Sequence, residues 1–216
     1  MNKTMDKLGN ITLYNADCMD IMKGFADNQF DLAIVDPPYG ININVSIGRR
    51  KGDLKSNYKK FAGEDSSIPN KVYFDELFRV SKNQIIWGGN YMTDFLYPSP
   101  CWILWDKLFS EDVTFAQFEM AWTSFKTSCK KYDISSNQQN RIHPTQKPVD
   151  LYKWILNRYA KEGQTILDTH LGSGSSAIAA HDGGFEFTGI ELDEEYYNAS
   201  KTIKFILIYG KNSIYL

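Results

Sequence analysis

Cysteine is scarce in this chain of 216 residues, which contains three, at Cys18, Cys101 and Cys129. They are far apart and form no Cys-x-x-Cys pair, so the sequence has neither a disulfide framework nor a cysteine-based metal motif. An odd and scattered set of cysteines is typical of proteins in a reducing cytosol. The three histidines also lack the spacing of metal ligands, and we therefore expect no bound metal.

Long apolar segments are absent as well. No run approaches the roughly 20 residues that a helix needs to cross a bilayer, and residues 1–7 lack the apolar centre of a signal peptide. An excess of positive charge is also missing, because the net charge is -2. This balance excludes a globally basic nucleic-acid binder but allows a local basic patch. We expect a cytoplasmic protein that does not bind a membrane.

The chain does contain enough apolar sequence for a full core, since 43% of its residues are hydrophobic and 14% are aromatic. Apolar runs of strand length alternate with segments of helical periodicity, which predicts a single α/β domain over residues 1–216. The predicted strands are 11–15, 30–35, 84–87, 101–106, 118–122, 165–168 and 187–191. The predicted helices are 18–24, 71–81, 149–160, 175–181 and 193–207. Two polar inserts, at about 41–65 and 107–142, are expected to lie outside this framework, and most of their length is predicted as loop.

The tetrapeptide Asp36-Pro37-Pro38-Tyr39 comes directly after a predicted buried strand, so a carboxylate and an aromatic ring follow the end of that strand. In open α/β sheets, ligands bind at the carboxyl ends of the strands. Two consecutive prolines remove backbone donors and stiffen the turn, which leaves carbonyl groups exposed. Such a turn suits a flat guest that carries an amino group. Taken alone, however, a Pro-Pro pair more often only ends a strand.

A second group of residues begins at Asp168, which is followed by Gly172, Gly174 and a predicted helix, while Glu191 ends the next predicted strand. Glycines let a ligand approach the backbone, and an acid at the end of the next strand can bind both hydroxyls of a ribose. Ala177 stands where the dinucleotide fingerprint has its third glycine, which favours a nucleoside without a pyrophosphate. The alternative is that the glycines only form a tight connection.

With these two groups the chain resembles the β class of site-specific DNA amino-methyltransferases, of the adenine type found in phages and prophages. Segments 14–18, 87–91, 101–106 and 143–148 are also similar to that family, so the resemblance covers most of the chain. Thr169 and His170 replace the Pro and Phe of the family's Asp-Pro-Phe-x-Gly-Ser-Gly-Thr pattern. The resemblance implies a Rossmann-like domain with a mostly parallel seven-stranded sheet, one antiparallel strand and a circularly permuted order. In that order the turn at residues 36–39, here named the catalytic turn, precedes the turn at residues 168–175, here named the cofactor turn.

The resemblance implies S-adenosyl-L-methionine as cofactor and double-stranded DNA as substrate. The catalytic residues that it implies are Asp36, Pro37, Pro38 and Tyr39. The cofactor-binding residues that it implies are Asp17, Asp36, Lys147, Asp168, His170, Gly172, Ser173, Gly174, Ser175, Glu191 and Leu192. For Asp17 the alternative is a helix N-cap ahead of Met19. Basic residues of the inserts are expected to contact DNA, namely Arg49, Arg50, Lys51, Lys55, Lys59, Lys60, Lys130, Lys131 and Arg141.

In such an enzyme, Asp36 and the Pro37 carbonyl would accept the two hydrogens of adenine N6 in a base flipped out of the duplex, with Tyr39 stacked on its ring. The resemblance also implies that an Asp at the first catalytic position favours adenine N6 over cytosine N4. The alternatives are an N4-cytosine methyltransferase, a methyltransferase of RNA or of protein glutamine, and a DNA-binding relative without catalysis. The short inserts suggest a short recognition sequence or the help of a second subunit, because members of the family often dimerise.

Overall fold

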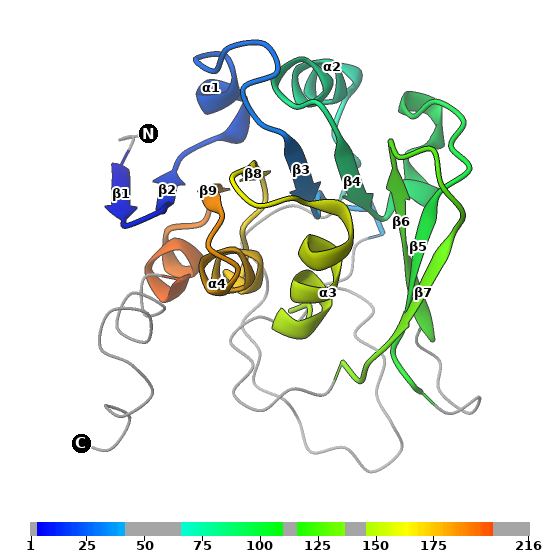
Figure 1. Cartoon of the computed structure of the whole chain (residues 1–216). Helices are drawn as coiled ribbons and strands as arrows, with labels where there is room; N and C mark the ends of the chain where they lie inside the picture. The colour runs from blue at the N-terminus through cyan, green and yellow to red at the C-terminus, as the bar shows by residue number, and fades with distance from the viewer. Residues whose placement is uncertain (1–3, 42–65, 110–115, 137–145, 201–216) are drawn as a thin grey trace, which may run out of the picture.

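The computed structural model describes residues 4–41, 66–109, 116–136 and 146–200, and its described strands form one nine-stranded sheet between two layers of helices (Figure 1). The strands are β1 (Thr4–Leu8), β2 (Ile11–Asn15), β3 (Leu32–Val35), β4 (Gln84–Trp87), β5 (Trp102–Asp106), β6 (Phe118–Thr123), β7 (Lys130–Asp133), β8 (Thr165–Asp168) and β9 (Glu186–Glu191). The helices are α1 (Cys18–Met22), α2 (Lys71–Val80), α3 (Val149–Tyr159) and α4 (Ser175–Asp182), with the short 3-10 turns η1 (Gly89–Tyr91) and η2 (Thr93–Phe95). Residues 194–200 are also helical.

The predicted α/β fold is confirmed, and each of the seven predicted strands is present, as β2 to β6, β8 and β9. Strand β6 is the expected antiparallel strand, since it runs opposite to both of its neighbours, β4 and β5. Two further strands correct the prediction. Strand β1 pairs antiparallel with β2 at one edge of the sheet, and β7 pairs parallel with β5 at the other.

These two edge strands have weak sequence patterns, which explains why the sequence does not predict them. Strand β1 has the sequence TMDKL and β7 has the sequence KKYD, and neither contains a fully buried residue. Each of these strands adopts its extended conformation through backbone pairing with a neighbouring strand rather than through burial of an apolar face. The segment 123–142, predicted as loop, therefore contains a strand at Lys130–Asp133.

The sheet order is β1-β2-β9-β8-β3-β4-β6-β5-β7, so the last two strands of the chain lie between the second and the third. Strand β8 pairs parallel with both β3 and β9, and β9 pairs parallel with β2. This is the permuted order that the resemblance implied. Because parallel neighbours end at the same edge of a sheet, the turns that follow β3 and β8 are adjacent although they are far apart in sequence.

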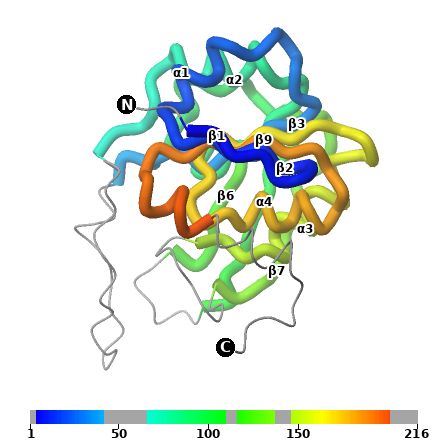
Figure 2. Tube along the Cα trace, turned by 90° about the vertical axis from the view of Figure 1, so that its left-hand side faces the viewer, coloured from blue at the N-terminus to red at the C-terminus, as the bar shows by residue number. Residues whose placement is uncertain are grey.

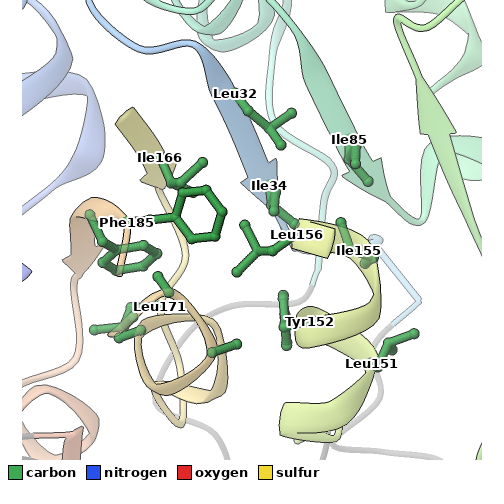
Figure 3. Packing of buried hydrophobic residues seen from close by; sticks show 14 of the residues in the cluster. Leu32, Ile34, Ile85, Leu151, Tyr152, Ile155, Leu156, Ile166, Leu171 and Phe185 are labelled. Atoms are coloured by element: carbon green, nitrogen blue, oxygen red, sulfur yellow. The ribbon is translucent and has the colours of Figure 1, made fainter. Parts of the chain in front are cut away.

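Two helical layers cover the two faces of the sheet, with α1 and α2 on one side and α3 and α4 on the other, as Figures 1 and 2 both show. Along β3, Leu32 and Ile34 belong to the core on the α3 side, whereas Ala33 and Val35 belong to the core on the α2 side. Figure 3 shows the side chains of Leu32 and Ile34 above α3. Both faces of β3 are buried, which explains why its sequence is apolar without alternation.

Candidate active site

Four acidic residues lie at the carboxyl ends of four successive strands of the sheet. Asp17 comes two residues after β2, Glu191 ends β9, Asp168 ends β8, and Asp36 follows β3 directly. Their positions in the sequence are distant, but the permuted order places them along one edge. This edge is where ligands bind in open α/β sheets.

The catalytic turn is held by its own side chains and by the end of β4. The Tyr39 hydroxyl donates to Asp36 Oδ1 at 2.6 Å. The Tyr39 ring lies against Gly88 so closely that a Cβ atom on residue 88 would overlap the ring. The ring also stacks on Tyr91, with centroids 5.4 Å apart and 18° between the planes. Tyr39 therefore occupies a defined position beside Asp36, and the aromatic surface expected for a flipped base is shared with Tyr91.

Lys147 provides the second contact to Asp36. Its ammonium donates to Asp36 Oδ2 at 2.5 Å and contacts Glu119 Oε2 at 3.1 Å. Glu119 in turn pairs through Oε1 with Lys107 at 2.7 Å. The Lys147 residue is only 4% exposed, and a chain of alternating charges links Asp36 through Lys147 and Glu119 to Lys107.

These charges keep one another ionised. Burial by itself disfavours the charged form of Lys147, but the carboxylates of Asp36 and Glu119 outweigh it and raise the pKa of Lys147 above its ordinary value. Burial would likewise raise the pKa of Glu119, yet the ammonium groups of Lys147 and Lys107 lower it to about 2. Lys147 is therefore an ammonium at neutral pH and cannot act there as a proton acceptor.

Lys107 and Glu119 were not predicted from sequence. The available signal was a single acid in the otherwise apolar strand that contains Glu119, but such a residue more often faces solvent. Lys147 was predicted to bind the cofactor, and its described carboxylate partners lie on the catalytic turn and on β6. Its role toward the cofactor stays a prediction.

The cofactor turn contains a buried acid. Asp168 is 1% exposed, and its carboxylate accepts hydrogen bonds from the Ser176 hydroxyl at 2.6 Å and from the His170 backbone N–H at 3.0 Å. Burial raises the pKa of Asp168 to about 7 despite these two bonds. Gly174 has a φ of +77° at the start of α4, a conformation that favours glycine. The turn is therefore compact, and its acid lacks a full counter-charge within the described residues.

Glu191 connects the cofactor turn to the end of β9. Its carboxylate accepts from the backbone N–H of Gly172 at 2.7 Å and from that of Asp193 at 2.8 Å. Burial raises the pKa of Glu191, and these backbone bonds oppose the shift. Each carboxylate oxygen keeps a second lone pair for another donor, so the expected binding of two ribose hydroxyls is compatible with this geometry.

The remaining predicted cofactor residues lie around this turn. The Asp17 carboxylate accepts from the Met19 N–H at 2.7 Å, which is the N-cap role considered as its alternative. Leu192 is 51% exposed beside Glu191. The hydroxyls of Ser173 and Ser175 lie 3.1 Å apart. A cofactor role for these four residues is compatible with their positions and stays a prediction.

The two departures from the family pattern form a polar chain. Thr169 Oγ1 lies 2.9 Å from His170 Nδ1 and 2.7 Å from the Tyr73 hydroxyl. Burial lowers the pKa of His170 to about 4, so its ring is neutral at physiological pH. Where the family pattern has Pro and Phe, this chain thus has hydrogen-bonded side chains.

Most of the predicted DNA-contacting residues fall outside the described residues, including the basic run of residues 49–60 and Arg141. Lys130 and Lys131 are described, and they lie on the edge strand β7. The Lys131 ammonium is 2.9 Å from Asp106 and 3.0 Å from Asp133, so its charge is already paired. Contact with DNA through any of these residues stays a prediction.

Two features are absent from the described residues. Among them, no group of three or more His, Cys, Asp or Glu side chains is placed to hold a metal ion. In the same part of the chain, no helix is both long enough and apolar enough to span a bilayer.

Comparisons with known proteins agree with this geometry. Residues 106–202 match a family model described as DNA methylase, of the N6/N4 type. The methylase YubD of Escherichia coli (strain K12) is 24% identical over 212 residues, covering 86% of each chain. The type II methyltransferase M2.MboI of Moraxella bovis is 24% identical over 237 residues, covering 89% of this chain and 86% of its own.

Solved structures share the fold. The crystal structure of an M1.HpyAVI–SAM complex aligns with a TM-score of 0.60 at 20% identity, covering 89% of this chain and 99% of that one. The cytosine-N4-specific PvuII DNA methyltransferase aligns with a TM-score of 0.64 at 14% identity, covering 95% and 89%. The site at the carboxyl edge of the sheet, the family model and the curated relatives agree in supporting a site-specific DNA methyltransferase, and the chain is similar to the N6/N4 DNA methylases.

Proposed function

We propose that this protein is a DNA methyltransferase that transfers the methyl group of S-adenosyl-L-methionine to N6 of an adenine flipped out of a specific double-stranded sequence. The observation that carries the proposal is the adjacency of two turns. Asp36 follows β3 and Asp168 ends β8, and these two strands are hydrogen-bonded neighbours. A group that accepts amino hydrogens therefore lies beside a nucleoside-binding turn.

The residues of the cofactor turn fit S-adenosyl-L-methionine. The buried carboxylate of Asp168 suits the positively charged amino group of the methionine part, because such a partner would offset the cost of its burial. Glu191 suits the ribose hydroxyls, and Gly172 allows a ligand close to the backbone. The bound cofactor supplies an electrophilic methyl group on a sulfonium sulfur. The solved M1.HpyAVI complex, which shares this fold, contains SAM.

Asp36 and the carbonyl of Pro37 act on the amino group of the base. The lone pair of adenine N6 is conjugated with the ring, so the nitrogen is a poor nucleophile. Two acceptors that bind its hydrogens orient the nitrogen and stabilise the positive charge that develops on it. The target base has to leave the duplex, because N6 is out of reach inside a stacked pair.

The tyrosines beside Asp36 suit the ring of such a base. Tyr39 and Tyr91 are already close to parallel, and Tyr91 is 46% exposed. An extruded base can stack on this aromatic surface, which is sequence-tolerant because each base has a π-face.

The test is an incubation of the purified chain with methyl-labelled cofactor and DNA, RNA or protein in parallel. We expect label in DNA alone, and digestion of that DNA to nucleosides should give N6-methyldeoxyadenosine. Label confined to RNA or protein would overturn the DNA substrate. Absence of label in each substrate, with the cofactor still bound, would support a non-catalytic DNA-binding relative.

N4-cytosine transfer is the second candidate, because a cytosine-N4-specific enzyme shares the fold with a TM-score of 0.64. The same acceptors at Asp36 and Pro37 would serve the amino group of cytosine. The nucleoside digest separates the two, since N4-methyldeoxycytidine would replace the adenine product. Sequencing of modified bases in DNA from expressing cells would then give the target sequence.

DNA binding is assigned to the inserts, and a second subunit remains part of the proposal. The basic residues 49–60 follow the catalytic turn in the sequence, and we assign them to contacts with DNA phosphates. Phosphate contacts of this kind position an enzyme without reading sequence. Size-exclusion chromatography with light scattering, with and without DNA, would show whether the active species is a dimer.

A further inference from the structure

Both carboxylate oxygens of Asp36 already accept hydrogen bonds. Oδ1 accepts from the Tyr39 hydroxyl at 2.6 Å, and Oδ2 accepts from the Lys147 ammonium at 2.5 Å. A substrate amino group that donates to Asp36 therefore competes with at least one of these donors. Of the two, the ammonium opposes the proposed chemistry, because a positive charge beside Asp36 weakens its ability to stabilise a second positive charge.

Lys147 has a second carboxylate in reach. Its ammonium lies 3.1 Å from Glu119 Oε2 and also over the Trp87 ring, 5.1 Å from the ring centroid. An ammonium has three donors, so it can release Asp36 and stay bound to Glu119. The buried ammonium would then keep a carboxylate partner throughout, and it would avoid the large cost of an unpaired buried charge.

Glu119 is itself held in place. Lys107 pairs with Oε1 at 2.7 Å, whereas Lys147 lies against the other carboxylate oxygen. The Lys107 side chain is 14% exposed, and the Glu119 side chain is 22% exposed. Glu119 thus presents Oε2 to Lys147 from β6, a strand that pairs with β4 and not with β3.

We propose that Glu119 is a positioning residue, which retains the Lys147 ammonium when the amino group of the substrate takes its place on Asp36. The proposal rests on the proposed function and adds to it the release of Asp36 before methyl transfer. Lys147 remains charged throughout and moves between two carboxylates. Glu119 does not touch the reacting atoms.

The first test is Glu119→Gln, which keeps the shape of the side chain and removes its charge. Among the described residues, Lys147 then has Asp36 as its single carboxylate partner, so near neutral pH kcat should fall about ten- to a hundredfold, the effect of one charged hydrogen bond. Loss of a counter-ion also lowers the pKa of Lys147 relative to the wild type. The deficit should therefore shrink at alkaline pH where Lys147 loses its proton, because deprotonated Lys147 releases Asp36. A Glu119→Gln variant with the wild-type kcat at neutral pH would overturn the proposal.

The second test is a double-mutant cycle with Lys147→Met. If Glu119 acts through Lys147, the Glu119→Gln change should have little further effect on kcat in the Lys147→Met background. An equal loss in both backgrounds would assign Glu119 a structural role alone. If Glu119→Gln and Lys147→Met change the cofactor Kd and leave kcat unchanged, Glu119 and Lys147 act in cofactor binding. This result too would overturn the proposal.

Controls separate this proposal from the proposed function. Asp75→Asn removes a carboxylate from an exposed pair with Lys71 on α2, and it should leave kcat unchanged. Thermal unfolding of each variant checks the fold. If the wild type transfers no methyl group to DNA, the proposed function is wrong, and so is the proposed release of Asp36 by Lys147. If the wild type is active and the cycle is additive, the release step alone fails.

Discussion

The ring of Tyr39 lies directly on the backbone of Gly88, at the point where β4 ends beside the catalytic turn. A Cβ atom on residue 88 would overlap three ring atoms of Tyr39, and even the most distant of them would be only 2.7 Å away. Gly88 also has a φ of +66°, which a residue with a side chain rarely adopts. The close approach lets the Tyr39 hydroxyl reach Asp36, so a glycine far from the catalytic turn in sequence helps to set the geometry of its acid.

Gly88→Ala is expected to displace Tyr39 and to reduce methyl transfer together with stability. The loss in the free energy of unfolding should be about 1–3 kcal/mol, the usual cost of forcing an extra methyl group into a packed site. Denaturant unfolding and the transfer assay measure the two effects. Gly9→Ala is a matched control, because Gly9 has a φ of +61° and no atom within 4 Å of the place where its Cβ would lie. If both variants lose the same stability, the backbone conformation alone explains the effect.

Asp36→Ala is expected to abolish methyl transfer while cofactor binding persists. Removal of a group aimed at developing charge typically lowers kcat by about 10²–10³-fold, and the variant also removes the carboxylate that Lys147 contacts on the catalytic turn. Labelled transfer and calorimetric titration with the cofactor measure the two quantities separately. Asp94→Ala removes an exposed acid of η2 and serves as a control. Transfer at the wild-type rate in the Asp36 variant would refute the mechanism.

Asp168 should make stability depend on pH. Burial raises its pKa from 3.8 to about 7. In the unfolded chain the carboxyl loses its proton near its ordinary pKa, whereas in the folded protein it keeps the proton up to about pH 7. Between these values the folded state binds more protons, so the free energy of unfolding falls as pH rises and the full cost is present above about pH 7.

Asp168→Asn removes this cost, and its gain in Tm over the wild type should therefore be larger at about pH 8 than at about pH 5. Thermal unfolding of both proteins without cofactor at the two pH values is the measurement. The same variant should bind the cofactor more weakly, because it lacks the charge proposed for the methionine amino group. A Tm difference that does not change with pH would show that Asp168 does not titrate in this range.

Neutralisation of Arg49, Arg50 and Lys51 is expected to weaken DNA binding and to reduce its salt dependence. Removal of each phosphate contact should lower the slope of log K against log salt by about 0.9. Fluorescence anisotropy at several salt concentrations measures this slope. Lys131→Ala should change it less, because Lys131 is already paired with Asp106 and Asp133. An unchanged slope in the triple variant would show that Arg49, Arg50 and Lys51 do not contact DNA phosphates.

The central strands and both turns could be predicted because their signals are local. An apolar run such as Leu32–Val35 is fully buried, and the Pro-Pro turn or Gly172 with Gly174 constrains the backbone by itself. The edge strands β1 and β7 lack such a signal. Their sequences are polar and at least partly exposed, and their conformation depends on the neighbour with which they pair.

The amino-acid sequence by itself determined the α/β class, the seven principal strands and the two turns that identify the site, because each depends on residues close together in the chain. The tertiary structure alone decided which side chains meet. Lys147 and Asp36 are separated by 111 positions, and Glu119 joins them from β6. No local pattern specifies such a contact, since it exists only after parallel pairing has brought distant strand ends to one edge.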